Sequence, residues 1–206
     1  MSWPFEGLER NGYDAIVADP PWHYKSWSSK GNTRSSEAHY KTMRMDDIIK
    51  LPVADLAKDD CHLFLWITGP FLVQGAHVEI FKAWGFNPSS MGFIWLKPKK
   101  SLWKSPGLFP NLSEDNFVKG MGRTTRQNAE YVLIGRRGKP PRDNMGMHQL
   151  LLEPRREHSR KPASFPGKIE TYIGPGKRVV DLFSRTSHPG WDAWGDEVSK
   201  FDEVAT

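Results

Sequence analysis

Residues 13–22 read YDAIVADPPW, an apolar, β-prone run that stops at an aspartate followed by two prolines. A short apolar run bounded by turn residues is typical of a buried strand, here residues 13–18. The prolines end the strand, because proline fixes φ and lacks the N–H that a strand donates. Four similar runs predict further strands, at 63–67, 93–96, 131–134 and 178–183.

Helical patterns lie between these runs. Apolar residues at helical spacing predict a helix over 71–84, with Gly85 where a helix commonly ends. Shorter helical pieces are expected over 46–57, broken at Pro52, and a helix over 161–173 opens with a proline. Strands that alternate with helices predict an α/β fold in which a mostly parallel sheet is covered on both faces.

Ligands of such a sheet bind beyond the carboxyl ends of its strands. Asp19 directly follows the first predicted strand, and Asp181 lies near the end of the last. Residues 20–40 and 97–128 are long polar stretches of the kind that form binding loops or lids. The sequence therefore predicts a site at this edge of the sheet.

The composition favours a single domain over residues 1–206 with an anionic partner. The formal net charge is +5, which favours nucleic acid, and nine tryptophans offer faces on which unpaired bases can stack. The single cysteine, Cys61, excludes an internal disulfide and suits a reducing cytoplasm. The N-terminus predicts no secretory signal, no apolar run is long enough to span a bilayer, and the histidines show no metal-binding spacing.

The DPPW sequence at 19–22 suits a site that grips an amino group. The amino nitrogen of adenine is a poor nucleophile, because its lone pair is delocalised into the ring. Asp19 can accept one amino hydrogen and the carbonyl of Pro20 the other, which aims the lone pair at a methyl donor. Pro21 stiffens the turn, and Trp22 or Tyr24 can stack on the base. The alternative interpretation is a strand end with an ordinary turn.

Several motifs, in order, resemble the MT-A family of adenine-N6 methyltransferases, named after the catalytic subunit of the eukaryotic messenger-RNA enzyme, and its bacterial and phage members in particular. They are VADPPW at 17–22, HLFLWITG at 62–69, KAWGFNP at 82–88, GMGRTTRQNAEYVLIGRRG at 120–138, SRKP at 159–162, DLFSR at 181–185 and WGDE at 194–197. The target motif at 19–22 precedes the cofactor motif at 181–197, which is the permuted order. The resemblance covers nearly the whole chain.

The resemblance implies a Rossmann-like fold with about seven strands and S-adenosyl-L-methionine as the cofactor. It places the catalytic pocket at Asp19, Pro20, Pro21 and Trp22. The cofactor would lie against residues near the last strand and one lysine: Asp19, Lys161, Asp181, Phe183, Arg185, His188, Asp196 and Glu197. Lys161 would contact the carboxylate of its methionine part. Two departures stand out: Asp196 and Glu197 replace the Asn-Gln or Asn-Glu of many members, and Arg160 replaces a histidine.

Basic and aromatic residues flank these motifs. Tyr24, Lys25, Arg123 and Arg126 are candidates for substrate binding, although loop residues of this kind also serve only to pack or solvate a loop. Basic clusters over 97–104, 136–142 and 155–161 are expected to contact a nucleic-acid backbone or to form solvated loops. Asn128 and Glu130 precede a predicted strand and either order that loop or take no special part.

The substrate expected from this pattern is DNA, methylated at the N6 amino group of adenine. The chain is compact, without an appended RNA-binding zinc finger or partner-binding extension, and resembles the bacterial and phage members. Two alternatives stay open: an RNA adenine methyltransferase of the same family, and an inactive relative that binds nucleic acid or a catalytic partner. The sequence leaves open a monomer or a homodimer.

Overall fold

The computed structural model describes residues 3–23, 42–104, 113–120, 124–157 and 159–202. Within them, seven strands form one sheet in the order β5-β3-β4-β2-β1-β6-β7. The strands are β1 (Tyr13–Ala18), β2 (Ala57–Ile67), β3 (Asn87–Leu96), β4 (Ala129–Arg137), β5 (Leu150–Leu152), β6 (Val179–Leu182) and β7 (Trp191–Trp194). The α/β fold with a seven-stranded, mostly parallel sheet is confirmed.

The sheet is parallel except at one strand. β1 runs parallel to β2 and β6, β6 to β7, and β3 to β5, whereas β4 is antiparallel to both of its neighbours. A strand that runs against its neighbours begins where they end. The register accordingly pairs Tyr131 with Ile67 at the end of β2, and Ala129 with Leu96 at the end of β3. The start of β4 therefore lies at the carboxyl edge of the parallel strands.

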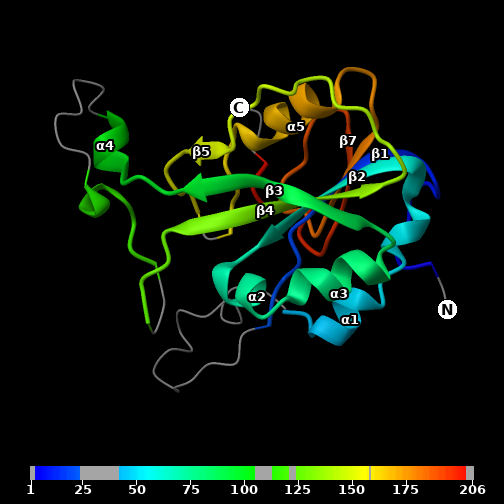
Figure 1. Cartoon of the computed structure of the whole chain (residues 1–206), viewed down its shortest axis with the longest axis horizontal. Coiled ribbons are helices and arrows are strands. Elements are labelled where there is room, and N and C mark those ends of the chain that lie inside the picture. The colour runs from blue at the N-terminus through cyan, green and yellow to red at the C-terminus, as the bar shows by residue number, and fades with distance from the viewer. Residues whose placement is uncertain (1–2, 24–41, 105–112, 121–123, 158, 203–206) are drawn as a thin grey trace.

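Helices cover both faces of the sheet, as expected from the sequence (Figure 1). On one face lie α1 (Met45–Ile49), α2 (Gly69–Val73) and α3 (Ala76–Ala83), and the buried side chains Ile48, Ile80 and Phe81 of α1 and α3 join one core cluster. On the other face lies α5 (Phe165–Ile173), which buries Phe165, Ile169 and Ile173 in a second cluster. Alternate residues of β1 divide between the two clusters, because successive side chains of a strand point to opposite faces.

Two predicted helices begin or end differently in the structure. The helix expected over 71–84 is two helices, α2 and α3, because Gly75 between them takes a φ of +77° that interrupts the helix. The helix expected over 161–173 begins only at Phe165, with a proline in its first turn, so Lys161 lies before the helix rather than in it. The pieces expected over 46–57 are confirmed as α1 and the 3₁₀ turn η3 (Val53–Asp55).

The long polar stretch after β3 has structure of its own. It contains α4 (Lys100–Lys104) and the 3₁₀ turn η4 (Glu114–Asn116), with 105–112 outside the described residues. Cys61 is buried in β2, and burial raises its pKa to about 12, as expected of a core thiol without reactivity. Among the helices of the described part of the chain, none has the length and hydropathy that a bilayer crossing requires.

Candidate active site

Two aspartates come together at the carboxyl edge of the sheet. Asp19 follows β1, its backbone N–H lies 3.4 Å from the carbonyl oxygen of Leu182 in β6, and Val17 pairs with Asp181 in the register of the two strands. Since Val17 and Val179 belong to the cluster beneath α5, the period of two places Asp19 and Asp181 on that same face. The structure thus brings the two predicted strand ends together, and their role as one site stays a prediction.

A chain of partly buried ion pairs extends from Asp19 across this edge. Lys161 Nζ lies 2.9 Å from Asp19 Oδ2 and 2.8 Å from Glu130 Oε2, and Glu130 in turn pairs with Lys97 at the end of β3. The side chains of Asp19, Lys161 and Glu130 are only 30%, 22% and 20% exposed. Antiparallel β4 makes the chain possible, because it brings Glu130 to the edge where β2 and β3 end.

Tryptophan rings pack against the two lysines of these ion pairs. Lys161 Nζ lies 4.7 Å from the ring centre of Trp66 and Lys97 Nζ 4.5 Å from that of Trp95, both within the range of a cation–π contact. Trp66 and Trp95 are buried in the cluster beneath α5. The two ammonium groups are therefore held between rigid aromatic surfaces and carboxylates.

Burial and pairing move the carboxyl pKa values in opposite directions. Burial raises the pKa of Asp19 although Lys161 opposes it, and burial raises the pKa of Asp181 to about 7 although Ser184 Oγ donates a 2.7 Å hydrogen bond to it. Burial also acts to raise the pKa of Glu130, but Lys161 and Lys97 outweigh it and lower that pKa to about 2. Glu130 is thus firmly ionised, whereas the pKa values of Asp19 and Asp181 are raised because burial outweighs the groups that favour their ionised forms.

The DPPW turn is held by its own backbone and by packing. Trp22 N–H donates to the carbonyl oxygen of Pro20 at 2.8 Å, and Met43 N–H donates to that of Pro21 at 2.8 Å. The Trp22 ring is 5% exposed and stacks on Phe71 of α2, with ring centres 4.7 Å apart. Trp22 therefore fastens the turn to the fold. Tyr24, the other residue that the sequence offers for stacking on the base, lies outside the described residues.

Several of the residues that the resemblance places against the cofactor follow the ends of β6 and β7. Phe183 takes a φ of +62°, and its ring meets that of Trp194 at 5.4 Å. Arg185 Nη2 lies 2.6 Å from Glu197 Oε2, which joins two of the predicted residues. The backbone at Gly195 passes close to that of Ser184. Glycine permits this, because a Cβ at position 195 would lie 2.7 Å from the carbonyl oxygen of Ser184.

The remaining candidates are less tightly placed. Asp196 is exposed at the same turn, and His188 packs against Trp191 with ring centres 5.3 Å apart, where burial lowers its pKa. Arg126 is exposed, whereas Lys25 and Arg123 lie outside the described residues, as Tyr24 does.

Sequence reasoning missed the central position of Glu130 and the role of Lys97. Glu130 had two open interpretations, and Lys97 counted only as part of a basic cluster. The available signal was the acidic residue at the start of a buried strand, where an unpaired charge is costly and a partner is to be expected.

Comparison with known proteins gives a consistent picture. The family model MT-A70 matches residues 13–197. A type II methyltransferase of Mycoplasma sp, M.MunI, is 30% identical, over 94% of this chain and 81% of that protein. The N6-methyladenosine RNA methyltransferase MTA1 of Cryphonectria parasitica is 28% identical over 93% of this chain, and the N(6)-adenine-specific methyltransferase METTL4 of Mus musculus 26% over 93%. The chain spans 53% and 39% of the lengths of these last two proteins.

Proposed function

Since this chain belongs to the MT-A70 family of N6-adenine methyltransferases, we propose that it transfers a methyl group from S-adenosyl-L-methionine to the N6 amino group of adenine in DNA. The observation that carries the proposal is the position of the Asp19 carboxylate. It lies directly after the carboxyl end of β1, in the residue before Pro20, with Lys161 paired to it at 2.9 Å and Asp181 on the neighbouring strand β6.

The groups at this edge fit the cofactor, which enzymes of this family use. Its methionine part carries a carboxylate, an ammonium group and the sulfonium. Lys161 suits the carboxylate, because an ammonium group is a compact positive charge with three donors. Burial raises the pKa values of Asp19 and Asp181, so a cationic ligand beside them would favour their ionised forms. Arg185, Asp196 and Glu197 would lie against the ribose and adenine.

In this proposal Asp19 and Pro20 orient the target. The Asp19 carboxylate accepts one amino hydrogen and the Pro20 carbonyl the other. The Pro20 oxygen already accepts the Trp22 N–H, but a carbonyl oxygen has two lone pairs, so it can accept a second donor. With both hydrogens held, the nitrogen directs its lone pair away from the ring and toward the donor. The cofactor, when bound, supplies the electrophilic methyl group.

Asp19 acts most strongly in the transition state. Positive charge develops on the nitrogen as its bond to the methyl carbon forms and the bond between that carbon and the cofactor's sulfur breaks, so the carboxylate binds the transition state more tightly than the ground state. One amino proton is then lost, to solvent or to Asp19. Lys161 favours the ionised form of Asp19 and, through Glu130, is itself fixed in place. Each hydrogen bond to a charged group contributes about 1.5–3 kcal/mol, enough to offset much of the few kcal/mol that flipping a base costs.

Support for DNA comes from a relative of which this chain covers more than two thirds. The chain matches 81% of a type II methyltransferase, and enzymes of that class methylate DNA. The RNA alternative has its own support, because the fungal RNA methyltransferase is of similar identity. The two alternatives differ only in the nucleic acid that is methylated, because the chemistry at the adenine amino group is the same for DNA and RNA.

A tritium-transfer assay tests the proposal. The chain is incubated with methyl-labelled cofactor and matched DNA and RNA oligonucleotides, single- and double-stranded, with Asp19→Ala as the background. Label on N6 of adenine in DNA, at least tenfold above RNA, is the expected result. A preference for RNA would mean that RNA, and not DNA, is the substrate. No label on either, together with no cofactor binding by calorimetry, would favour the inactive, nucleic-acid-binding or partner-binding relative.

A further inference from the structure

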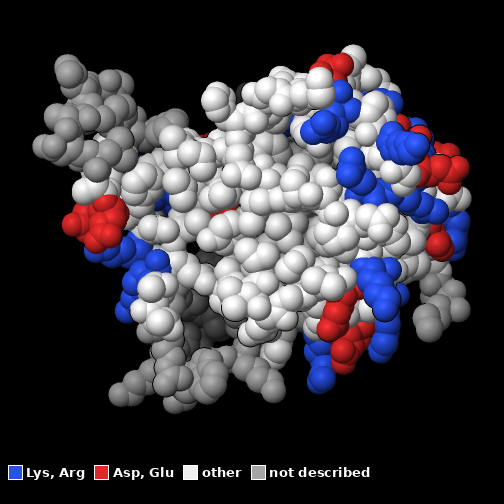
Figure 2. Space-filling view, in the orientation of Figure 1, with Lys and Arg blue, Asp and Glu red and all other residues white. Residues whose placement is uncertain are grey.

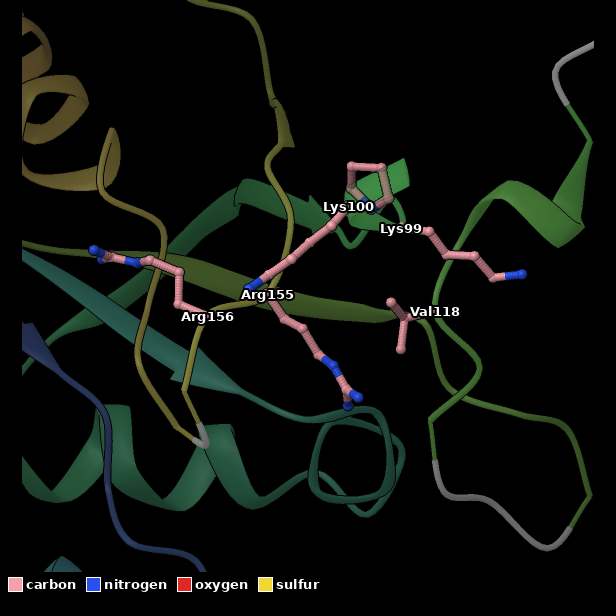
Figure 3. Close-up of a pocket in the computed structure, with 6 residues that line it drawn as sticks. Lys99, Lys100, Val118, Arg155 and Arg156 are labelled. Atoms are coloured by element: carbon pink, nitrogen blue, oxygen red, sulfur yellow. The ribbon is translucent and has the colours of Figure 1, made fainter. Parts of the chain in front are cut away.

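A basic pocket lies beside the ion-pair chain, between the segment after β3 and the segment after β5. Its volume is about 380 Å³, and its lining residues are Pro98, Lys99, Lys100, Val118, Arg155 and Arg156 (Figure 3). Four of the six carry a positive charge and none a negative one. Two segments that are more than fifty residues apart in sequence therefore bring their cations to one place.

These cations differ from the lysines of the active site. Lys97 and Lys161 are largely buried and each is paired with a carboxylate, whereas Lys99, Lys100 and Arg155 are exposed. Within the described residues, no ion pair of Lys99, Lys100 or Arg155 is found. Asp115 of η4 is engaged by Lys119 at 2.8 Å, and Lys99 is the smallest of the causes that act on its lowered pKa.

Figure 2 shows acidic and basic atoms together at the side of the molecule that carries η4, further groups of basic and acidic atoms toward the opposite side, and a largely uncharged centre between them. Since a net charge of +5 is modest, a local concentration of unpaired cations is the feature that can attract an anion.

Both walls of the pocket are anchored to the active site. Lys99 is two residues from Lys97, and the wall is held by hydrogen bonds from Lys99 N–H to the carbonyl oxygen of Asn116 and from Val118 N–H to that of Lys97, each 2.8 Å. On the other wall, Arg156 Nη2 donates to the carbonyl oxygen of Lys161 at 2.8 Å. An anion in the pocket would therefore lie next to the residues that flank Asp19.

The arrangement of the side chains indicates a chain of anions rather than one. In Figure 3 Lys99 and Arg156 extend in opposite directions, and Lys100 reaches toward Arg155. Cations that converge suit a single phosphate, whereas cations that are spread out suit successive phosphates along a strand. The apolar side chains Pro98 and Val118 between them can pack against a sugar.

We propose that this pocket binds the phosphodiester backbone of the strand that carries the target adenine, at the nucleotides next to it. The inference rests on the proposed function, because it takes adenine in nucleic acid as the substrate. Phosphate contacts of this kind fix the register of a strand without reading its sequence. The pocket would hold the backbone while the adenine enters the site at Asp19.

Salt-dependent binding tests the pocket. We compare the wild type, Lys99→Ser/Lys100→Ser, Arg155→Ser and a control, Lys50→Ser/Lys82→Ser, which removes the same charge as the double variant from exposed positions just after α1 and on α3. Affinity for a labelled adenine-containing oligonucleotide is measured by fluorescence anisotropy between 0.05 and 0.3 M salt, taken as roughly the range in which counterion release is measured. Melting temperatures and cofactor affinity confirm that each variant is folded.

Each lost phosphate contact should lower the slope of log affinity against log salt by about 0.7–0.9. The Lys99/Lys100 variant is therefore expected to bind roughly 25- to 60-fold more weakly near 0.1 M salt, and Arg155→Ser roughly 5- to 8-fold. Both should keep wild-type cofactor affinity and, at saturating oligonucleotide, nearly wild-type kcat. The control should stay within about twofold, as expected for distant surface charges.

The proposed role of the pocket is wrong if the Lys99/Lys100 variant shows the wild-type salt slope, or if its affinity changes no more than that of the control. Failure of the proposed function gives a different pattern, namely no methyl transfer by the wild type in the tritium assay. If the wild type methylates adenine while the pocket variants bind as tightly as it does, only the pocket inference is wrong. If the wild type binds no oligonucleotide at all, the pocket inference fails as well.

Discussion

Strand β1 carries an aspartate near each end, and the two carboxyl groups are opposite in character. At the start, Asp14 accepts a 2.7 Å hydrogen bond from Lys58 Nζ and a 3.0 Å bond from Arg178 N–H. Burial acts to raise its pKa, but these partners outweigh it and the pKa is lowered. At the other end, five residues on, burial raises the pKa of Asp19 in spite of its contact with Lys161.

The two carboxylates differ in the charged groups that surround them. Around Asp14 the charges are matched, and a second pairing nearby joins Arg178 to Glu9 and Asp192. Around Asp19 two more carboxylates, Glu130 and Asp181, share the edge with two lysines. At the Asp14 end of the strand the charges are balanced within the protein. At the Asp19 end the carboxyl groups outnumber the lysines, as expected of a site for a cationic ligand.

The largest expected effect is that of Asp19→Ala on turnover. Loss of an acceptor that stabilises charge in the transition state lowers kcat by at least roughly 10²–10³-fold, whereas cofactor affinity should stay within a few-fold. Single-turnover methyl transfer and calorimetry measure the two quantities. Near-normal kcat in this variant would contradict the role assigned to Asp19, and equal loss in Asp14→Ala, once that variant is shown to be folded, would erase the contrast between the strand ends.

The next largest effect is that of Lys161→Met on cofactor affinity. Loss of one charged hydrogen bond to the cofactor's carboxylate should weaken binding by about 10- to 150-fold. Lys58→Met is the matched control, because Lys58 pairs with Asp14 at the other end of the strand. The control should bind the cofactor like the wild type. If both variants lose affinity equally, the effect comes from lost stability and Lys161 has no direct role.

Local patterns in the sequence predict the ends of β1 well and the partners of Asp19 poorly. The strand over 13–18 is confirmed to the residue, because an apolar run that is followed by Asp19 and two prolines has a well-defined end. That Asp19 and Asp181 are neighbours follows from the parallel pairing of their strands. In contrast, Glu130 bonds to Lys97 and Lys161, which lie 33 and 31 residues away.

The reason is that strand direction is a long-range property. An apolar run looks the same whether it pairs in parallel or antiparallel, so the reversal of β4 could not be read from residues 131–134. That reversal alone decides whether Glu130 lies at the active edge or at the opposite one. β5 and β7 escaped the sequence analysis for a simpler reason, since three and four residues are too few to show a period.

A smaller effect is expected in the pH dependence of cofactor binding. The free protein holds the pKa of Asp181 at about 7, and a bound cation would favour the ionised form. Affinity should therefore rise about tenfold between about pH 6 and pH 8, because binding releases a proton that Asp181 holds at the lower pH. Calorimetry in two buffers of different ionisation enthalpy measures that proton. Asp181→Asn should abolish the dependence, and a wild-type profile in this variant would assign the proton to another group.

The smallest effect on function, and a purely structural one, is expected for Asp14→Asn. The neutral amide loses the charge that Lys58 pairs with, at a cost of about 1.5–3 kcal/mol, or roughly 3–12 °C in melting temperature at pH 7. Because the folded pKa of Asp14 is lowered, its contribution to stability is present above the unfolded pKa of 3.8 and disappears as the pH falls through the folded value. Melting curves of the two proteins should therefore converge toward pH 3, while kcat at 25 °C stays unchanged at neutral pH. A drop in kcat without a drop in melting temperature would mean that the amino end of β1 takes part in function, and the division between a structural and a functional end would no longer hold.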